Sequence, residues 1–420
     1  MTMTISPGDA ARELMSGLAE PVVLAAMSPQ LPESLVTALI REARTSRRRL
    51  TLLIADLSGA WAFIDDDAMP DVTAGTLRLV TVGGGVPRRL ARHADFIPNS
   101  LWDFDRLIRS GDLGFDIFVE RVGLTTDPDH VTHGDMIGFS DAALATRARV
   151  GFEVARHAFP YPGAGGVPLR RAAQVIAAAP LVAPRPSAQP DAVQRLIADH
   201  VAALVPDGAT LQLGLGMIPN AVIHALSGKS HLGIHSGILP GELQALLASG
   251  AVTGSRKGRD RGRHVATGIL GGDPRGWGAD VLLRPVTETH DPLRLRELDS
   301  LWAINSAFEI DLAGQVNAEH VNGSRVANGG GQTDFMRAAH ANSGGAAVLA
   351  LPARSRSGVS RIVGYLPAGH TVTTSGSDVD FVVTEHGTAD FRGRSADERA
   401  RALIGIAHPD DRPGLRAQWR

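Results

Sequence analysis

The chain has 420 residues, 44% of them hydrophobic, and a formal charge of −2 at pH 7. This length exceeds one ordinary hydrophobic core, so we expect two domains, and the near-neutral charge excludes a general attraction to nucleic acid or to an anionic membrane. Cysteine is absent, which excludes disulfides, thiolate metal sites and a cysteine nucleophile, and we expect no metal cofactor. No apolar run is long enough to span a bilayer and the amino terminus lacks a signal-peptide pattern, so we expect a soluble, cytoplasmic protein.

Short β-rich runs alternate with helical patterns along the first half, which is typical of an α/β fold with mostly parallel sheets. The stretch Pro32–Arg41 has helical spacing and a proline start. Strands are expected at residues 50–55, 77–82, 115–122 and 150–154.

A proline-rich segment at residues 177–190 (AAAPLVAPRPSAQP) cannot continue a helix and is interpreted as an interdomain linker. A helix is expected at residues 191–204. The sequence therefore predicts one α/β domain at residues 1–185 and a second at residues 186–420. Strands of the second domain are expected near Leu211, Leu232, Val265, Ala303, Val348, Ile362 and Phe381.

Residues 209–226 (ATLQLGLGMIPNAVIHAL) indicate a strand, a glycine-bearing turn and a helix that opens at Pro219. Glycines let the backbone approach a ligand, and a helix amino terminus offers unpaired N–H groups to an anion. Gly214, Gly216 and Asn220 are therefore candidate contacts to a phosphate or an oxyanion. The alternative is a plain turn between strand and helix, and the proline at 219 excludes a dinucleotide-binding Gly-x-Gly-x-x-Gly pattern.

A second glycine cluster, residues 326–335 (VANGGGQTDF), precedes a helical stretch. Three consecutive glycines are costly to order, by about 1 kcal/mol each relative to alanine, so Gly329, Gly330 and Gly331, with Gln332, are interpreted as a close approach to a ligand. Asn305 follows a β-run, where its amide can orient a carbonyl or carboxylate, or can instead satisfy turn backbone.

The stretch at residues 232–243 (LGIHSGILPGEL) resembles the active-site segment of the acetyl-CoA hydrolase and CoA-transferase family. That family carries Gly-Ile-His-Thr-Glu-Met, and the glutamate attacks the acyl-CoA thioester. The matching position here is Gly237, and the spacing to the turn at residues 250–253 holds this register without a gap. The resemblance therefore implies the frame of a thioester enzyme without its nucleophile.

The resemblance covers residues 209–415 almost without a break and the first half more thinly. It implies two CoA-transferase-like α/β domains, an N-terminal one at 1–185 and a C-terminal one at 186–420, with the site at their interface, a homodimer, and coenzyme A or acyl-CoA as substrate. One further departure lies at residues 374–377 (TSGS), where family members carry an arginine after the threonines. The resembling runs are residues 28–35, 97–100, 138–141, 303–331, 360–363, 379–387, 391–393 and 406–409.

Several other polar residues are candidates for chemistry. His235 and Ser236 flank the lost nucleophile, and strand alternation points them to opposite faces, so a serine–histidine pair is not expected between them. His320 is the other candidate general base. A basic run at residues 256–263 is interpreted as a solvated loop, with contact to CoA phosphates or to an acyl-carrier protein as the alternative.

Three hypotheses follow. The first is an enzyme that moves an acyl group from a CoA thioester directly to a small-molecule acceptor or to water, with the glycine loops and Asn305 polarising the carbonyl. The second is a CoA-transferase or hydrolase whose carboxylate comes from another position, such as Glu242. The third is a catalytically silent protein that keeps the CoA pocket. None of them involves nucleic acid or a membrane.

Overall fold

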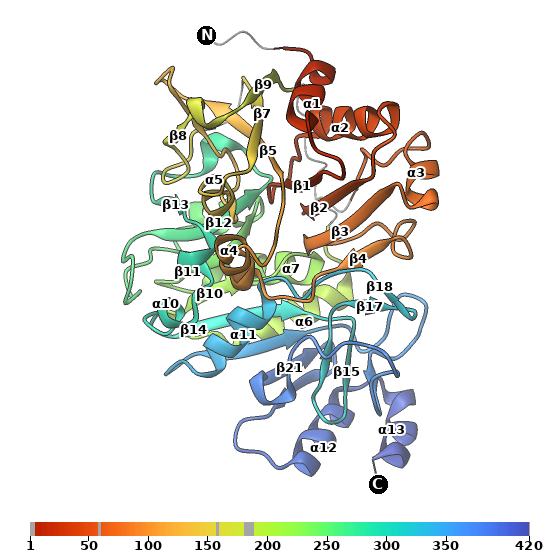
Figure 1. The fold of residues 1–420 in the computed structure, drawn as a ribbon. Coiled ribbons are helices and arrows are strands. Elements are labelled where there is room, and N and C mark those ends of the chain that lie inside the picture. The colour runs from red at the N-terminus through yellow and green to blue at the C-terminus, as the bar shows by residue number, and fades with distance from the viewer. Residues whose placement is uncertain (1–4, 58–59, 157–158, 180–188, 420) are drawn as a thin grey trace.

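Two large, mostly parallel β-sheets organise the computed structural model, which describes residues 5–57, 60–156, 159–179 and 189–419 (Figure 1). One sheet is built from strands that end at residue 177, and the other from strands that begin at residue 210. This agrees with the expected α/β class. The expected domain boundary at residue 185 lies outside the described residues.

The first sheet has the parallel order β4-β3-β2-β1-β5-β7-β9, and β6 and β8 extend it from β5 in antiparallel pairs. Its strands are β1 (Val22–Ala25), β2 (Leu50–Asp56), β3 (Leu77–Gly84), β4 (Ala94–Phe96), β5 (Ile117–Leu124), β6 (His130–Thr132), β7 (Arg149–Ala155), β8 (Val167–Pro168) and β9 (Gln174–Ala177). The helices of this lobe are α1 (Pro7–Met15), α2 (Glu33–Thr45), α3 (Met69–Ala74), α4 (Leu101–Ser110) and α5 (Ser140–Leu144).

The second sheet has the order β13-β12-β11-β10-β14-β19-β21-β22, and only its last pair is antiparallel. Its strands are β10 (Thr210–Leu213), β11 (Gly233–Pro240), β12 (His264–Leu270), β13 (Val281–Leu283), β14 (Leu301–Ser306), β19 (Ala346–Ala350), β21 (Phe381–Thr384) and β22 (Gly387–Asp390). The helices are α6 (Ala192–Leu204), α7 (Met217–Ala225), α8 (Leu243–Ala248), α9 (Val286–Thr289), α10 (Pro292–Leu295), α11 (Gln332–His340), α12 (Ala396–Ile406) and α13 (Arg412–Gln418).

Small sheets lie beside this second sheet. The strand expected near Ile362 is present as β20 (Ile362–Val363), and it pairs with β15 (Glu309–Asp311) in a small sheet. The helix expected to open at Pro219 begins two residues earlier, at Met217. The remaining short strands are β16 (Val316–Asn317), β17 (His320–Val321) and β18 (Ser324–Arg325).

Local sequence explains why helix α6 begins where the sequence predicts it. The Asp191 side chain accepts a hydrogen bond from the Gln194 backbone N–H, and the Gln194 side chain accepts one from the Asp191 N–H. This capping box satisfies two backbone donors at the helix start and contributes about 1 kcal/mol. Helix α6 then packs against α7, which covers the second sheet.

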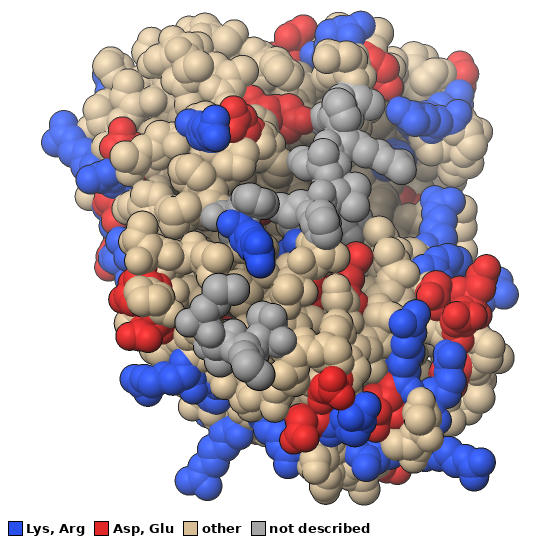
Figure 2. Space-filling view, turned by 90° about the horizontal axis from the view of Figure 1, so that it is seen from above, with Lys and Arg blue, Asp and Glu red and all other residues tan. Residues whose placement is uncertain are grey.

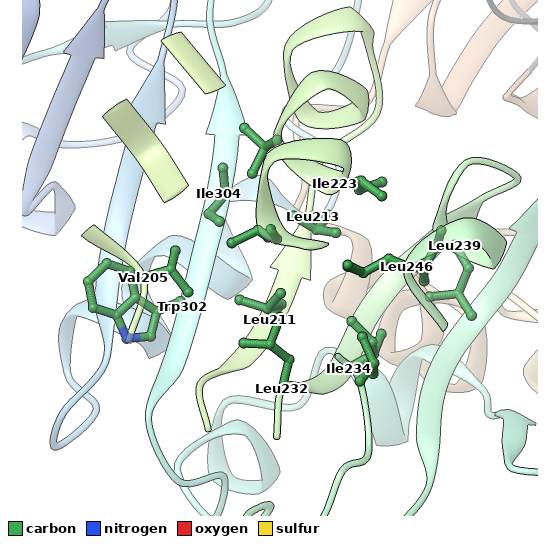
Figure 3. Close-up of a cluster of buried hydrophobic side chains, with 14 of the residues drawn as sticks. Val205, Leu211, Leu213, Ile223, Leu232, Ile234, Leu239, Leu246, Trp302 and Ile304 are labelled. Carbon is green, nitrogen blue, oxygen red and sulfur yellow. The ribbon is translucent and has the colours of Figure 1, made fainter. Parts of the chain in front are cut away.

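A large apolar cluster lies between the central strands of the second sheet and helices α6 and α7 (Figure 3). Leu211 of β10 lies in register between Ile234 of β11 and Trp302 of β14. Strands buried on both faces lack the alternation of a half-exposed sheet, which is why these runs are almost continuously apolar.

Backbone hydrogen bonds join the two lobes. Ile269 N–H of β12 donates to the Asp135 carbonyl at 2.8 Å, and Ile137 N–H donates to the Thr267 carbonyl at 3.0 Å. Val86 N–H donates to the Val326 carbonyl at 2.8 Å. The carboxyl end of the second sheet is therefore held against the first lobe.

The surface carries both signs of charge. On the face in Figure 2, Lys and Arg side chains are interspersed with Asp and Glu, and most of the visible surface is uncharged. Within the described part of the chain, no helix is both long enough and apolar enough to cross a membrane.

Leu211→Ala is expected to lower the free energy of unfolding by about 2–5 kcal/mol, because it removes fully buried methyl groups and leaves a cavity. The matched control is Leu196→Ala on α6, where the side chain is 49% exposed, with an expected change of about 0.5 kcal/mol. Urea unfolding followed by circular dichroism measures both. Equal losses would contradict the assignment of Leu211 to the core.

Candidate functional site

The order of strands in the second sheet creates a switch point beside β10. From β10 the chain proceeds through β11, β12 and β13 on one side, and then returns to β14 on the other side. In open α/β sheets, ligands bind at the carboxyl ends of the strands that flank such a reversal. Gly214 follows β10 and Asn305 lies near the end of β14, so the sheet brings these two candidates together.

The Asn305 side chain is oriented by a reciprocal amide pair. Its Nδ2 donates to Oε1 of Gln212 at 2.8 Å, and Nε2 of Gln212 donates to Oδ1 of Asn305 at 3.3 Å. A Cβ at position 214 would lie 2.9 Å from Asn305 Oδ1, so this approach requires glycine. The pair leaves one Nδ2 hydrogen that can donate to a carbonyl oxygen.

The turn after β10 ends at the amino terminus of α7. Gly216 has a φ of 128°, a conformation that only glycine adopts readily, and Met217 begins the helix. Asn220 lies half-buried on the first turn, where its N–H donates to the Gly216 carbonyl at 3.1 Å. The free N–H groups of this helix start lie beside a cavity that Met217 lines.

This cavity has a volume of about 690 Å³ and draws its walls from both lobes. Arg88 comes from the first lobe, while Arg354, Arg356 and Arg361 come from the segment after β19. Burial lowers the pKa of Arg361, which nevertheless stays a cation at neutral pH. The arginines outnumber the acidic residues in the wall, so the cavity favours an anionic ligand.

His320 lies in the wall of the same cavity. Its ring stacks on His370 with centroids 5.0 Å apart, and its Nδ1 accepts a hydrogen bond from the Thr371 N–H at 3.3 Å. Burial and the neighbouring His370 lower the pKa of His320, so the ring is neutral at pH 7. A neutral ring that faces a cavity is consistent with the predicted base, but His370 and the backbone restrict its movement.

Gly237 lies in the middle of β11, where the strand reaches solvent. The residue is half-exposed, whereas Ser236 and Leu239 are each 1% exposed. A Cβ built at position 237 would lie 3.1 Å from Nε2 of His290 and 3.7 Å from Phe335. The position that the resemblance assigns to a catalytic glutamate therefore faces an imidazole and an aromatic ring.

The neighbours of Gly237 are engaged in structural contacts. Nε2 of His235 donates to the Thr289 carbonyl at 3.1 Å, and burial, followed by the nearby Lys257, lowers the pKa of His235 to about 3. The Ser236 hydroxyl lies within 3.2 Å of the Leu213 carbonyl and accepts from the N–H of the same residue. Both side chains tie β11 to its surroundings, and neither contacts the other in the described structure.

The second glycine cluster packs against His290 and Glu319. A Cβ at Gly331 would lie 2.5 Å from Nε2 of His290, and one at Gly329 would lie 3.6 Å from Oε1 of Glu319. The Gly330 carbonyl accepts from Leu101 N–H at 3.1 Å, so these glycines also serve the contact between the lobes.

Gln332 and Asp334, which follow the three glycines, extend this contact. Nε2 of Gln332 donates to the Thr374 hydroxyl at 3.3 Å, within the stretch that departs from the family pattern. Asp334 accepts from Trp102 N–H at 3.3 Å. Burial raises the pKa of Asp334 to about 7, against the opposing effect of hydrogen bonds from Ser100 and Trp102.

The basic run at residues 256–263 lies near the beginning of β11. Nζ of Lys257 donates to the carbonyls of Ile234 and Arg263, and Arg259 pairs with Glu297 at 2.6 Å. Lys257 is 3% exposed, so at this residue the expectation of a solvated loop is wrong. Its aliphatic part fills the space beside Gly233, which has no side chain.

Sequence reasoning missed His290 and Phe335. Their rings lie 4.7 Å apart, and they come from α9 and α11, which are distant in the chain. His290 follows a four-residue helix between prolines and carries no motif, so no local pattern indicates a role. Among the described residues, no group of three or more His, Asp or Glu side chains could hold a metal ion.

Asp334→Asn is expected to reduce the dependence of stability on pH. The folded pKa of Asp334, about 7, lies above its ordinary value of 3.8, so the unfolded chain loses this proton first and stability falls as the pH rises between these values. The asparagine variant lacks this contribution. Melting temperatures at pH 5 and pH 8 should therefore show a larger decrease for the wild type, and parallel decreases would contradict the assignment.

Comparisons with known proteins agree with this geometry. Residues 278–419 match the acetyl-CoA hydrolase/transferase C-terminal domain. The 4-hydroxybutyrate coenzyme A transferase of Clostridium kluyveri is 39% identical over 235 residues, which is 54% of each chain. The acetyl-CoA hydrolase of Saccharomyces cerevisiae is 33% identical over 210 residues, which is 48% of this chain and 38% of the yeast protein. The matched region thus spans about half the length of the Clostridium protein and a smaller share of the yeast protein.

Solved structures match over almost the whole chain. RipA from Yersinia pestis superimposes with a TM-score of 0.87 at 28% identity, covering 99% of this chain and 96% of RipA. The 4-hydroxybutyrate CoA-transferase of Porphyromonas gingivalis gives a TM-score of 0.79 at 25% identity, covering 99% and 97%. The chain therefore has the fold of these two structures, and its residues 278–419 match the C-terminal domain of the acetyl-CoA hydrolase/transferase family.

Proposed function

We propose that this protein is an acyl-CoA-using enzyme that transfers the acyl group from the thioester directly to a small-molecule acceptor or to water. No glutamyl-CoA intermediate forms at position 237. The observation that carries the proposal is the environment of Gly237, a half-exposed position whose nearest facing atoms belong to His290 and Phe335. Glycine has no side chain that could form an anhydride or a thioester.

The cavity supports a CoA thioester as substrate. Its volume of about 690 Å³ lies within the usual range for ligand pockets, and Arg88, Arg356 and Arg361 in its wall suit the phosphates of coenzyme A, whereas Arg354 is paired with Asp411. In this arrangement the phosphates bind among the arginines and the thioester lies at the opening beside β11.

Polarisation of the thioester carbonyl is assigned to Asn305 and to the glycine loops. The remaining Nδ2 hydrogen of Asn305, whose side chain is held by Gln212, is a preorganised donor of the kind that stabilises an oxyanion. Removing one such donor costs about 100- to 1000-fold in turnover in well-studied enzymes.

The alternative with a displaced carboxylate has less support. Glu309 accepts from Asn317 at 3.0 Å, and Glu319 forms an ion pair with Arg325, so both side chains already have partners. Glu242 lies at the start of α8, five residues beyond Gly237. A silent CoA-binding protein would not need the oriented amide of Asn305. An acyl-carrier protein as donor, a homodimer and a cytoplasmic location stay predictions.

The wild-type protein is expected to release free CoA from at least one acyl-CoA in a panel of short and branched thioesters. Because the chain has no cysteine, a thiol reagent reports CoA alone. Borohydride or hydroxylamine should leave the enzyme unaffected during turnover, because no glutamyl thioester is present. Trapping of a modified Glu or Asp by mass spectrometry would support the displaced carboxylate instead, and absence of turnover across the panel would support the silent binder.

Gly237→Glu is expected to create CoA exchange between an acyl-CoA and a free carboxylic acid, and to reduce the native turnover. A Cβ at this position already lies 3.1 Å from His290, so Gly237→Glu combined with His290→Ala should exchange CoA faster than Gly237→Glu alone. A misplacement of about 1 Å costs on the order of a hundredfold, which sets the scale of the difference. Gly228→Glu is the control, because its Cβ meets no atom within 4 Å. Native turnover unchanged by Gly237→Glu would place the reacting carbonyl elsewhere.

A further inference from the structure

His290 is a buried titratable residue to which the proposed function assigns no chemical step. It follows α9 at the junction of the lobes and is 1% exposed. Its ring lies between two glycines, because a Cβ at Gly237 would meet Nε2 at 3.1 Å and a Cβ at Gly331 would meet it at 2.5 Å. Any side chain at these positions would crowd the imidazole, so both glycines make room for Nε2.

The other ring nitrogen is held in place. Nδ1 of His290 lies 2.7 Å from Oγ1 of Thr289, which itself donates to the Pro285 carbonyl and contacts the Thr267 hydroxyl. A hydroxyl has one hydrogen, so when Thr289 donates to Pro285 it accepts from Nδ1–H. In this hydrogen-bond arrangement the proton lies on Nδ1 and the lone pair lies on Nε2.

Nothing in the described structure hydrogen-bonds Nε2 of His290. Nε2 of His290 is not fully enclosed, whereas Nδ1 of His235 is fully enclosed and has no hydrogen-bond partner in the described chain. Nε2 therefore keeps a small accessible area at the half-exposed opening beside Gly237. Burial lowers the pKa of His290 to about 3, which keeps the ring neutral at pH 7.

We propose that His290 is the catalytic base that activates the acceptor, with Nε2 taking its proton. This inference rests on the proposed function and deepens it. It identifies the acceptor by chemistry, as a molecule with an O–H or N–H group, including water, that reaches Nε2 from the partly exposed side at Gly237.

The reaction balances without a further reactant. The acceptor oxygen or nitrogen forms a bond to the thioester carbonyl carbon as its proton passes to Nε2. The tetrahedral intermediate collapses, the C–S bond breaks, and Nε2–H returns the proton to the departing thiolate. The products are the acylated acceptor, or the free acid when water attacks, and CoA. The imidazolium exists only between the two transfers.

The test measures CoA release by the wild type, His290→Asn and His290→Ala, with His264→Asn as the matched control. Asparagine keeps a donor for Thr289 and removes Nε2. His264 is also buried and has a pKa lowered to about 4, but it lies at the start of β12, beside Val281. We expect kcat to fall about 100- to 10,000-fold in both His290 variants, with little change in KM, and less than about threefold in the control.

Chemical rescue separates a base from a structural residue. Added imidazole should restore part of kcat in His290→Ala, because the vacated space lies between two glycines, and should not affect His290→Asn. Gly237→Ala, whose Cβ crowds Nε2, should lower kcat in the wild type and have no further effect in the His290→Ala background. Melting curves record the stability of the His290 variants. The two readouts above stay informative even if that stability is lowered.

The outcomes distinguish the two proposals. A wild type that releases CoA while a folded His290 variant keeps its kcat within about threefold overturns the base and leaves the proposed function intact. Failure of imidazole to rescue folded His290→Ala, or an acylated His290 peptide during turnover, also overturns it. A wild type that releases no CoA from any acyl-CoA removes the proposed function itself.

Discussion

The backbone contact between the lobes is the constraint on which the site depends. The carboxyl end of β12 pairs with the loop at residues 135–138, and the glycine cluster at residues 326–331 lies against the first lobe. Buried N–H and C=O groups need partners, so each of these hydrogen bonds fixes one lobe relative to the other. Arg88, which the first lobe contributes to the cavity wall, is held against the second lobe by this contact.

Glycine is used in this interface for close approach. Gly268 leaves room for Met136, Gly214 for Asn305, and Gly331 for His290. At each of these positions a Cβ would collide with a side chain from a different element. The concentration of glycine around the site is therefore explained by packing between elements, and the same absence of side chains leaves backbone N–H groups near the opening for a ligand.

The absence of a side chain at Gly237 affects the electrostatics around His290. A glutamate there would place a negative charge beside a buried, neutral imidazole, which would raise the pKa of His290 and draw a proton to it. With glycine, the ring stays neutral and its lone pair is available. The nature of residue 237 and the protonation of His290 are thus coupled, and a covalent route and a base-assisted route would exclude each other at this position.

The sequence by itself determined the α/β class and most strands of the two large sheets, because these depend on local periodicity and on turn residues. It also indicated Gly214 and Asn305, since polar and glycine residues at the ends of parallel strands meet at one edge. It did not indicate His290, Phe335 or the buried Lys257. Their neighbours come from elements far apart in the chain, and only the packing of α9 and α11 against β11 decides which ring faces the missing side chain. The tertiary structure also decided that Ser236 bonds to β10, because the partner of a hydroxyl depends on which strand lies beside it.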